Sequence, residues 1–152
     1  MRTLAIDLGT RRVGLALSDE GGRFATPYEV VEVSSPEMAA ARVLEVMERE
    51  GVERVVVGLP LNMDDSVGPA ARQTVAWGNA VGRRANKPVV YVDERLSSFA
   101  AEQTLNDRKR GGERLTRKRR KEQLDALAAA GFLQAFLDGK LPPMDVTDLA
   151  SP

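Results

Sequence analysis

The sequence contains no cysteine and no histidine. The lack of cysteine excludes disulfides and thiolate metal ligands. The lack of histidine removes imidazole as a ligand or base, which excludes Ser-His and Cys-His catalysis. Any metal site must therefore use oxygen ligands, which favour hard cations such as Mg²⁺ or Mn²⁺.

Long apolar runs are also missing. No stretch approaches the roughly 18 apolar residues of a membrane span, and the first residues follow a strand pattern and not that of a signal sequence. We therefore expect a cytoplasmic protein without membrane contact. With 152 residues, 43% of them hydrophobic, the chain can form one domain with a sizeable core. We expect this domain to span residues 1–138, and residues 139–152 to form a flexible tail.

Charge is distributed unevenly along a chain whose net charge is zero. Between residues 108 and 121, nine basic residues accompany a single acid, so this segment carries +8 and the remainder −8. The basic residues are Arg108, Lys109, Arg110, Arg114, Arg117, Lys118, Arg119, Arg120 and Lys121. Because Lys and Arg contacts to phosphates supply most sequence-independent affinity for nucleic acid, we expect a polyanion-binding surface. A solvated helix face is the alternative.

Hydrophobic periodicity predicts nine elements in the order β-β-β-α-β-α-β-α-α. The predicted strands span residues 3–8, 13–17, 24–33, 54–58 and 88–93. The predicted helices follow the third strand and also span about 69–85, 97–105 and 116–137. Ser34 and Glu37 have capping-box spacing for the first helix, which Gly51 should end. The fold class is therefore α/β: a mixed five-stranded sheet, with an antiparallel meander continued by parallel strands, and helices on both faces.

Asp7 lies at the end of the first predicted strand, on the same face as Thr3 and Ala5. A carboxylate on a packed strand is costly unless a positive or hydrogen-bonding group meets it. A metal ion could fill this role. A turn cap bonded to the amides around Gly9 could fill it equally well, so this stretch leaves both interpretations open.

Two further acids are expected near Asp7. Glu94 directly follows the last predicted strand, and Asp125 lies on the apolar side of the final helix. In α/β sheets, functional groups gather beyond the carboxyl ends of the parallel strands. Because three carboxylates cannot all stay ionised side by side without cations, their convergence favours a metal site.

Each of these acids also has a structural interpretation. Glu94 and the preceding Asp93 could form ion pairs with Arg95, and Asp125 could pair with Lys121 one helical turn earlier. The convergence of three acids is harder to explain in this way. An oxygen-only site beside a basic segment suits phosphodiester hydrolysis by two metal ions about 4 Å apart, which needs no histidine.

Four motifs in this order resemble the YqgF family, also called RuvX. They are DLGTRRVGLALSD at 7–19, GLPLNMD at 58–64, DERLSS at 93–98 and the basic stretch that leads to Lys121, Asp125 and Ala128-Ala129. The resemblance extends to about Leu137. It implies a ribonuclease H-like fold, kinship with RuvC Holliday-junction resolvases and a role as a pre-16S rRNA nuclease.

The resemblance also implies residue roles. Asp7, Glu94 and Asp125 resemble the family's catalytic, metal-binding acids. The residues that resemble its supporting site residues are Gly9, Arg12, Asn62, Asp64, Arg95 and Lys121. Two positions depart from the family pattern: Asp65 replaces the usual Gly, and Ser98 replaces the usual Thr. The loop acids Asp64 and Asp65 taken alone are more typical of turns than of metal ligands.

Residues and resemblance together favour a Mg²⁺- or Mn²⁺-dependent nuclease that processes the 5′ end of pre-16S rRNA, as a monomer or homodimer. A resolvase acting on branched DNA and an RNA-binding module without catalysis are the alternatives. The Asp-x-Gly-Thr stretch at residues 7–10 also resembles the phosphate loop of actin-like and sugar-kinase ATPases. Those proteins need two such domains, and this chain is long enough for one.

Overall fold

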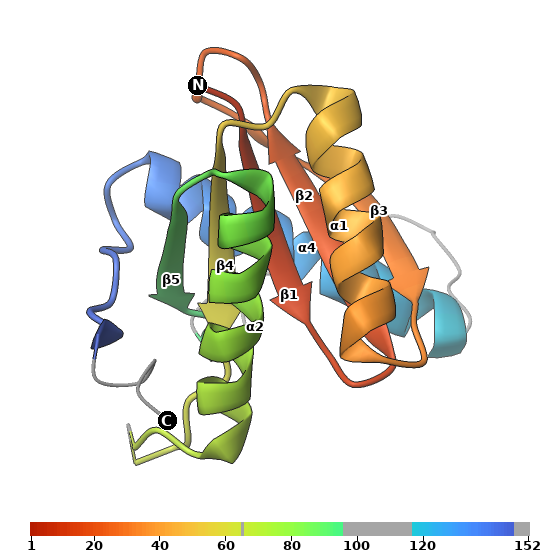
Figure 1. Cartoon of the computed structure of the whole chain (residues 1–152), viewed down its shortest axis with the longest axis vertical. Helices are drawn as coiled ribbons and strands as arrows, with labels where there is room; N and C mark the ends of the chain where they lie inside the picture. The colour runs from red at the N-terminus through yellow and green to blue at the C-terminus, as the bar shows by residue number, and fades with distance from the viewer. Residues whose placement is uncertain (65, 96–116, 148–152) are drawn as a thin grey trace, which may run out of the picture.

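The computed structural model describes residues 1–64, 66–95 and 117–147, without the side chains of residues 117–124. In these ranges the elements are β1 (Thr3–Leu8), β2 (Arg12–Ser18), β3 (Ala25–Glu32), α1 (Pro36–Glu50), β4 (Arg54–Leu59), α2 (Pro69–Ala85), β5 (Val89–Asp93) and α4 (Arg117–Leu137). The helix expected at 97–105 lies outside the described residues. Helices α1 and α2 cover one face of the sheet, and α4 covers the other (Figure 1).

The strands form one mixed sheet in the order β3-β2-β1-β4-β5. β1, β2 and β3 pair antiparallel, whereas β4 pairs parallel with β1 and β5 parallel with β4. The predicted α/β class and the meander continued by parallel strands are confirmed. The carboxyl ends of β1, β4 and β5 therefore meet at one edge of the sheet, the lower edge in Figure 1.

Strand alternation divides the interior into two cores. Leu4 and Ile6 of β1 belong to the core beneath α1 and α2. Ala5 belongs to the opposite core, with Ala129 and Phe132 of α4. Since side chains two residues apart point to the same face, Asp7 faces α4.

Helix α1 begins one residue later than the capping-box spacing predicted. The N-cap is Ser35, whose hydroxyl accepts a hydrogen bond from the Met38 amide at 3.1 Å. Ser35 has the extended backbone of an N-cap directly before Pro36, the first helical residue, so Ser34 stays outside the helix. Gly51 ends α1 in the left-handed conformation, as predicted.

The segment that follows α4 packs against the outer strand of the sheet. Leu141 is buried, and the Met144 amide donates to the Tyr91 carbonyl of β5 at 2.7 Å. Residues up to 147 thus cover part of an exposed strand edge, which differs from the flexible tail expected at 139–152. Residues 148–152 lie outside the described ranges. Among the described helices, none has the length and hydropathy of a membrane span.

Candidate active site

Asp7 lies opposite a glycine whose missing side chain lets α4 approach the sheet. In the β1–β2 register, Asp7 pairs with Gly14. A Cβ atom at Gly14 would overlap the backbone carbonyl of Asp125 and lie 3.0 Å from the Asp125 Cβ. The helix can therefore reach this point of the sheet only because residue 14 is glycine, and the contact brings Asp125 beside Asp7.

A second glycine leaves room for Glu94. Gly58 lies near the end of β4, the strand on the other side of β1. A Cβ atom there would come within 2.9 Å of the Glu94 Cβ, 3.1 Å of its Oε2 and 2.8 Å of Phe132 Cε2. The two strands that flank β1 thus each have a glycine near Asp7. Asp125 approaches over Gly14, and Glu94 approaches over Gly58.

Asp7 and Glu94 share a hydrogen bond in a partly buried setting. Burial is the main cause that raises the pKa of Asp7 from 3.8 to about 8, followed by the charge of Glu94, the hydrogen bond with it and the charge of Asp125. The pKa of Glu94 is also raised, first by burial and then by the charges of Asp93 and Asp125, while its hydrogen bond with Asp7 opposes the shift. The pKa values of both carboxyls are raised, so this pair keeps a proton at a higher pH than exposed carboxyls would.

Asp125 is held by a cation from the start of β2. The Arg12 Nε donates to the Asp125 Oδ2 at 2.9 Å, and each side chain is 29% exposed. The sequence alone suggested Lys121 as the ion-pair partner, but the described partner is Arg12, 113 residues away. The side chain of Lys121 lies outside the described residues.

The donor chemistry of this cluster fits a hard divalent cation. Asp7 and Glu94 place carboxyl oxygens close together in a partly buried position, where a cation could offset their mutual repulsion. Among the described side chains, which are those of residues 1–64, 66–95 and 125–147, no three acids already have the arrangement of a metal-binding group. Asp125 would be the third ligand, and its Oδ2 is engaged by Arg12 in this structure.

Arg95 joins the end of β5 to the loop after β4. Its guanidinium binds Asp93 with an Nη2–Oδ2 distance of 2.6 Å and donates from Nη1 to the Asn62 carbonyl at 3.0 Å. The hydrogen bond from Arg95 lowers the pKa of Asp93. The ion pair suggested for Asp93 is thus present, whereas Glu94 turns to Asp7.

Asp64 has the turn-forming role that its loop position suggested. Its Oδ1 accepts from the Ser66 amide at 3.0 Å and from the Ser66 hydroxyl at 2.6 Å, and the side chain is exposed. The hydrogen bond from the Ser66 hydroxyl is the main cause that lowers the pKa of Asp64. The Asn62 side-chain amide donates to the same hydroxyl at 2.9 Å. Gly9 closes the turn between β1 and β2, where its amide donates to the Arg12 carbonyl at 2.9 Å.

Several predicted residues lie outside the described part. They are Asp65, Ser98, Arg108, Lys109, Arg110 and Arg114. The backbone of Arg117, Lys118, Arg119 and Arg120 belongs to the first turn of α4, without a description of the side chains. The phosphate-binding role of this basic segment therefore stays a prediction.

The sequence analysis did not identify the two glycines beside Asp7 as site residues. A signal was available, because a glycine inside a strand often marks a place where another segment approaches closely. Gly14 and Gly58 both follow this rule, and in each strand the residues on either side of the glycine are apolar.

The raised pKa of Asp7 predicts an unusual pH dependence of stability. Between the unfolded pKa of 3.8 and the folded value of about 8, Asp7 holds a proton only in the folded state. Unfolding then releases a proton, so this carboxyl makes the protein less stable as pH rises through that window. Asp7→Asn should therefore raise the melting temperature relative to wild type, and the difference should grow from pH 5 to about pH 8. Thermal unfolding across this range tests the prediction, and a constant difference contradicts it.

A family model and curated relatives match nearly the whole chain. The model described as RuvX, Holliday junction resolvase, matches residues 1–139. A protein of Acidiphilium cryptum named "Putative pre-16S rRNA nuclease" is 40% identical over 137 residues, which cover 90% of this chain and 84% of that protein. A protein of the same name from Desulforudis audaxviator is 37% identical over 140 residues, covering 92% and 96% of the two chains.

Solved structures share the fold. RuvC of Thermus thermophilus superposes with a TM-score of 0.59 at 22% identity, covering 95% of this chain and all of that chain. The same protein in complex with a Holliday junction substrate gives a TM-score of 0.58 at 24% identity, covering 95% and 99%. At this level of identity the likeness is one of fold, which is the predicted ribonuclease H-like fold.

Proposed function

The chain belongs to the RuvX family, and from this premise we propose that it is a nuclease that hydrolyses phosphodiester bonds at the 5′ end of pre-16S rRNA. The observation that carries the proposal is the meeting of Asp7, Glu94 and Asp125 at the carboxyl edge of the sheet. The two curated relatives named for this activity support the choice of substrate.

We assign Asp7, Glu94 and Asp125 as the catalytic acids and as ligands of Mg²⁺ or Mn²⁺. Two such ions would activate a water and stabilise the leaving oxygen. Asp7 must lose its proton to act as a ligand, so ion binding should be favoured as pH rises toward 8. Arg12 would guide Asp125 and keep its charge compensated while no ion is bound.

The remaining site residues are assigned to support and substrate binding. Arg95 and Asn62 connect the loop after β4 to the end of β5, and Gly9 and Asp64 shape turns at this edge. Lys121 is assigned as a supporting cation. Phosphates of the substrate are assigned to Arg108, Lys109, Arg110, Arg114, Arg117, Lys118, Arg119 and Arg120.

We take residues 1–138 as the nuclease domain, against which Leu141 and Met144 of the following segment pack, and place its action in the cytoplasm, on an RNA precursor. A second candidate substrate is branched DNA, favoured by the description of the matching family model as a Holliday junction resolvase. A resolvase would act as a dimer that makes paired cuts. A binding module without catalysis is the third candidate, and the full set of three acids argues against it.

Cleavage assays on two substrates test the proposal. We expect the protein to cut a fragment spanning the 5′ end of pre-16S rRNA in the presence of Mg²⁺ or Mn²⁺, and to lose this activity when the ions are chelated. Cutting of a four-way DNA junction with the RNA left intact would favour the resolvase. Salt-sensitive RNA binding without cleavage in either metal would favour the binding module.

A further inference from the structure

A cavity of about 420 Å³ opens at the same edge of the sheet as the acids, on the side of α1 and α2. Leu8, Gly9 and Thr10, which directly follow Asp7 in the chain, form part of its lining. The amino ends of α1 and α2 flank this edge (Figure 1). Asp7 and the cavity therefore lie on opposite faces of the sheet at the end of β1, and a ligand that crosses this edge could reach both.

The lining of this cavity is uncharged and mostly apolar. None of the described residues that surround it has an ionisable side chain. The wall includes Trp77, whose indole N–H donates to the Pro36 carbonyl at 2.9 Å and is therefore already satisfied. Thr10 and Gln73 add hydroxyl and amide groups. A planar, neutral group with polar edges suits these apolar surroundings.

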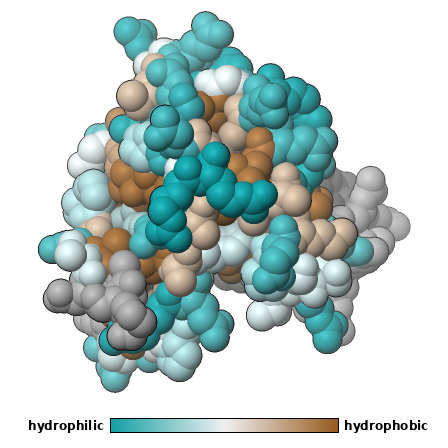
Figure 2. Space-filling view, in the orientation of Figure 1, coloured by the Kyte–Doolittle hydropathy of each residue, from teal (hydrophilic) through white to brown (hydrophobic). Residues whose placement is uncertain are grey.

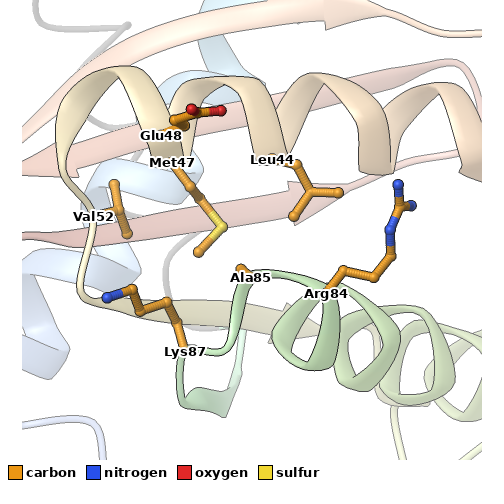
Figure 3. Close-up of a pocket in the computed structure, with 7 residues that line it drawn as sticks. All are labelled: Leu44, Met47, Glu48, Val52, Arg84, Ala85 and Lys87. Atoms are coloured by element: carbon orange, nitrogen blue, oxygen red, sulfur yellow. The ribbon is translucent and has the colours of Figure 1, made fainter.

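A second cavity differs from this one because charged side chains line it. It has a volume of about 400 Å³ and lies between the carboxyl ends of α1 and α2, at the other end of the sheet. Figure 3 shows Glu48, Arg84 and Lys87 around its apolar side chains. Hydrophobic side chains are visible among hydrophilic ones on this helical face of the molecule (Figure 2). Of these two cavities, only the one beside Asp7 combines an uncharged lining with proximity to the acids.

We propose that the cavity beside Leu8 and Trp77 binds one unpaired base of the RNA substrate near the bond that is cut. This inference rests on the proposed nuclease function. Proteins recognise RNA sequence mainly through unpaired bases that stack on aromatic side chains and form hydrogen bonds at their edges. Trp77 would supply the apolar wall, and Thr10 and Gln73 the polar partners.

Tryptophan fluorescence tests the proposal, because Trp77 is the single tryptophan of the chain. The protein is titrated, with metal ions chelated, with a single-stranded oligoadenylate and with an abasic ribose-phosphate oligomer of equal length. Binding is followed independently by the fluorescence anisotropy of a dye attached to one end of each oligomer. We expect only the oligoadenylate to quench Trp77, and its affinity to exceed that of the abasic oligomer about 5- to 150-fold, the range for a base–aromatic stack.

Two matched variants of α2 serve as the test and the control. Ala70 and Ala76 are both exposed, but only Ala70 lines the cavity. Ala70→Phe should fill the cavity and abolish the quenching and the base-dependent affinity, whereas Ala76→Phe should keep both. Thermal unfolding verifies that the two variants fold.

Equal affinity for the two oligomers, an unchanged Trp77 signal on binding, or wild-type behaviour of Ala70→Phe would each overturn the inference. The titration needs no cleavage, so it is separable from the proposed function. Quenching by a protein that cuts no precursor would contradict the nuclease assignment and leave the base site standing. Cleavage without quenching would contradict the base site alone.

Discussion

Replacing Asp7 with asparagine is expected to reduce metal-dependent cleavage at least about 10³-fold, because a neutral amide cannot supply the anionic oxygen that a divalent cation requires. The fold should be preserved. The amide can still donate to Glu94, and the substitution removes a carboxyl whose burial opposes ionisation. Initial cleavage rates of the precursor RNA, measured with thermal unfolding of the same preparations, provide the test.

Asp138→Asn is the matched control for this substitution. Asp138 is an exposed residue just after α4, and its carboxylate accepts a hydrogen bond from Gln134 at 3.1 Å. The control should cleave at the wild-type rate. The active-site assignment fails if Asp7→Asn retains full activity. If Asp7→Asn is inactive but unfolded, the loss reflects folding, and the assumption of a preserved fold is wrong.

Gly14→Ala is expected to affect both stability and activity. Its new methyl group would overlap the backbone carbonyl of Asp125, so α4 would have to move away from β2. Overpacking of this kind costs roughly 1–3 kcal/mol of unfolding free energy. Since Asp125 moves with α4, cleavage should also fall about 10²-fold, the typical effect of misplacing a catalytic group by about 1 Å. Denaturant unfolding and cleavage rates measure the two effects.

Gly21→Ala provides the comparison for Gly14→Ala. Gly21 lies in the exposed turn after β2, where a Cβ atom would meet only the Asp19 Oδ2, at 3.2 Å. This control should change the unfolding free energy by less than about 0.5 kcal/mol and leave cleavage unchanged. If Gly14→Ala matched wild type in both measurements, close contact between α4 and β2 would not be needed to position Asp125.

Local patterns in the sequence predicted most of the fold. Alternation identified β1 and β2, and the predicted bounds of α2 agree with the observed Pro69–Ala85. The errors concern the first residue of α1 and the segment that covers the edge of β5. Ser35 and not Ser34 caps α1, because neighbouring serines offer the same hydroxyl and the backbone before Pro36 selects one. The packing of residues 141–147 on β5 was not foreseen, because it depends on a strand edge far away in the sequence.

The sequence by itself determined the chemistry open to this protein and the family to which it belongs. Without cysteine or histidine, any metal site must use oxygen ligands, and the four motifs indicated which acids would provide them. Only the tertiary structure decided how those acids are held. It joins Asp7 and Glu94 by a hydrogen bond between their carboxyls, and it pairs Asp125 with Arg12. Such contacts follow from strand register and from the close approach of α4 at Gly14, which join segments that local periodicity treats independently.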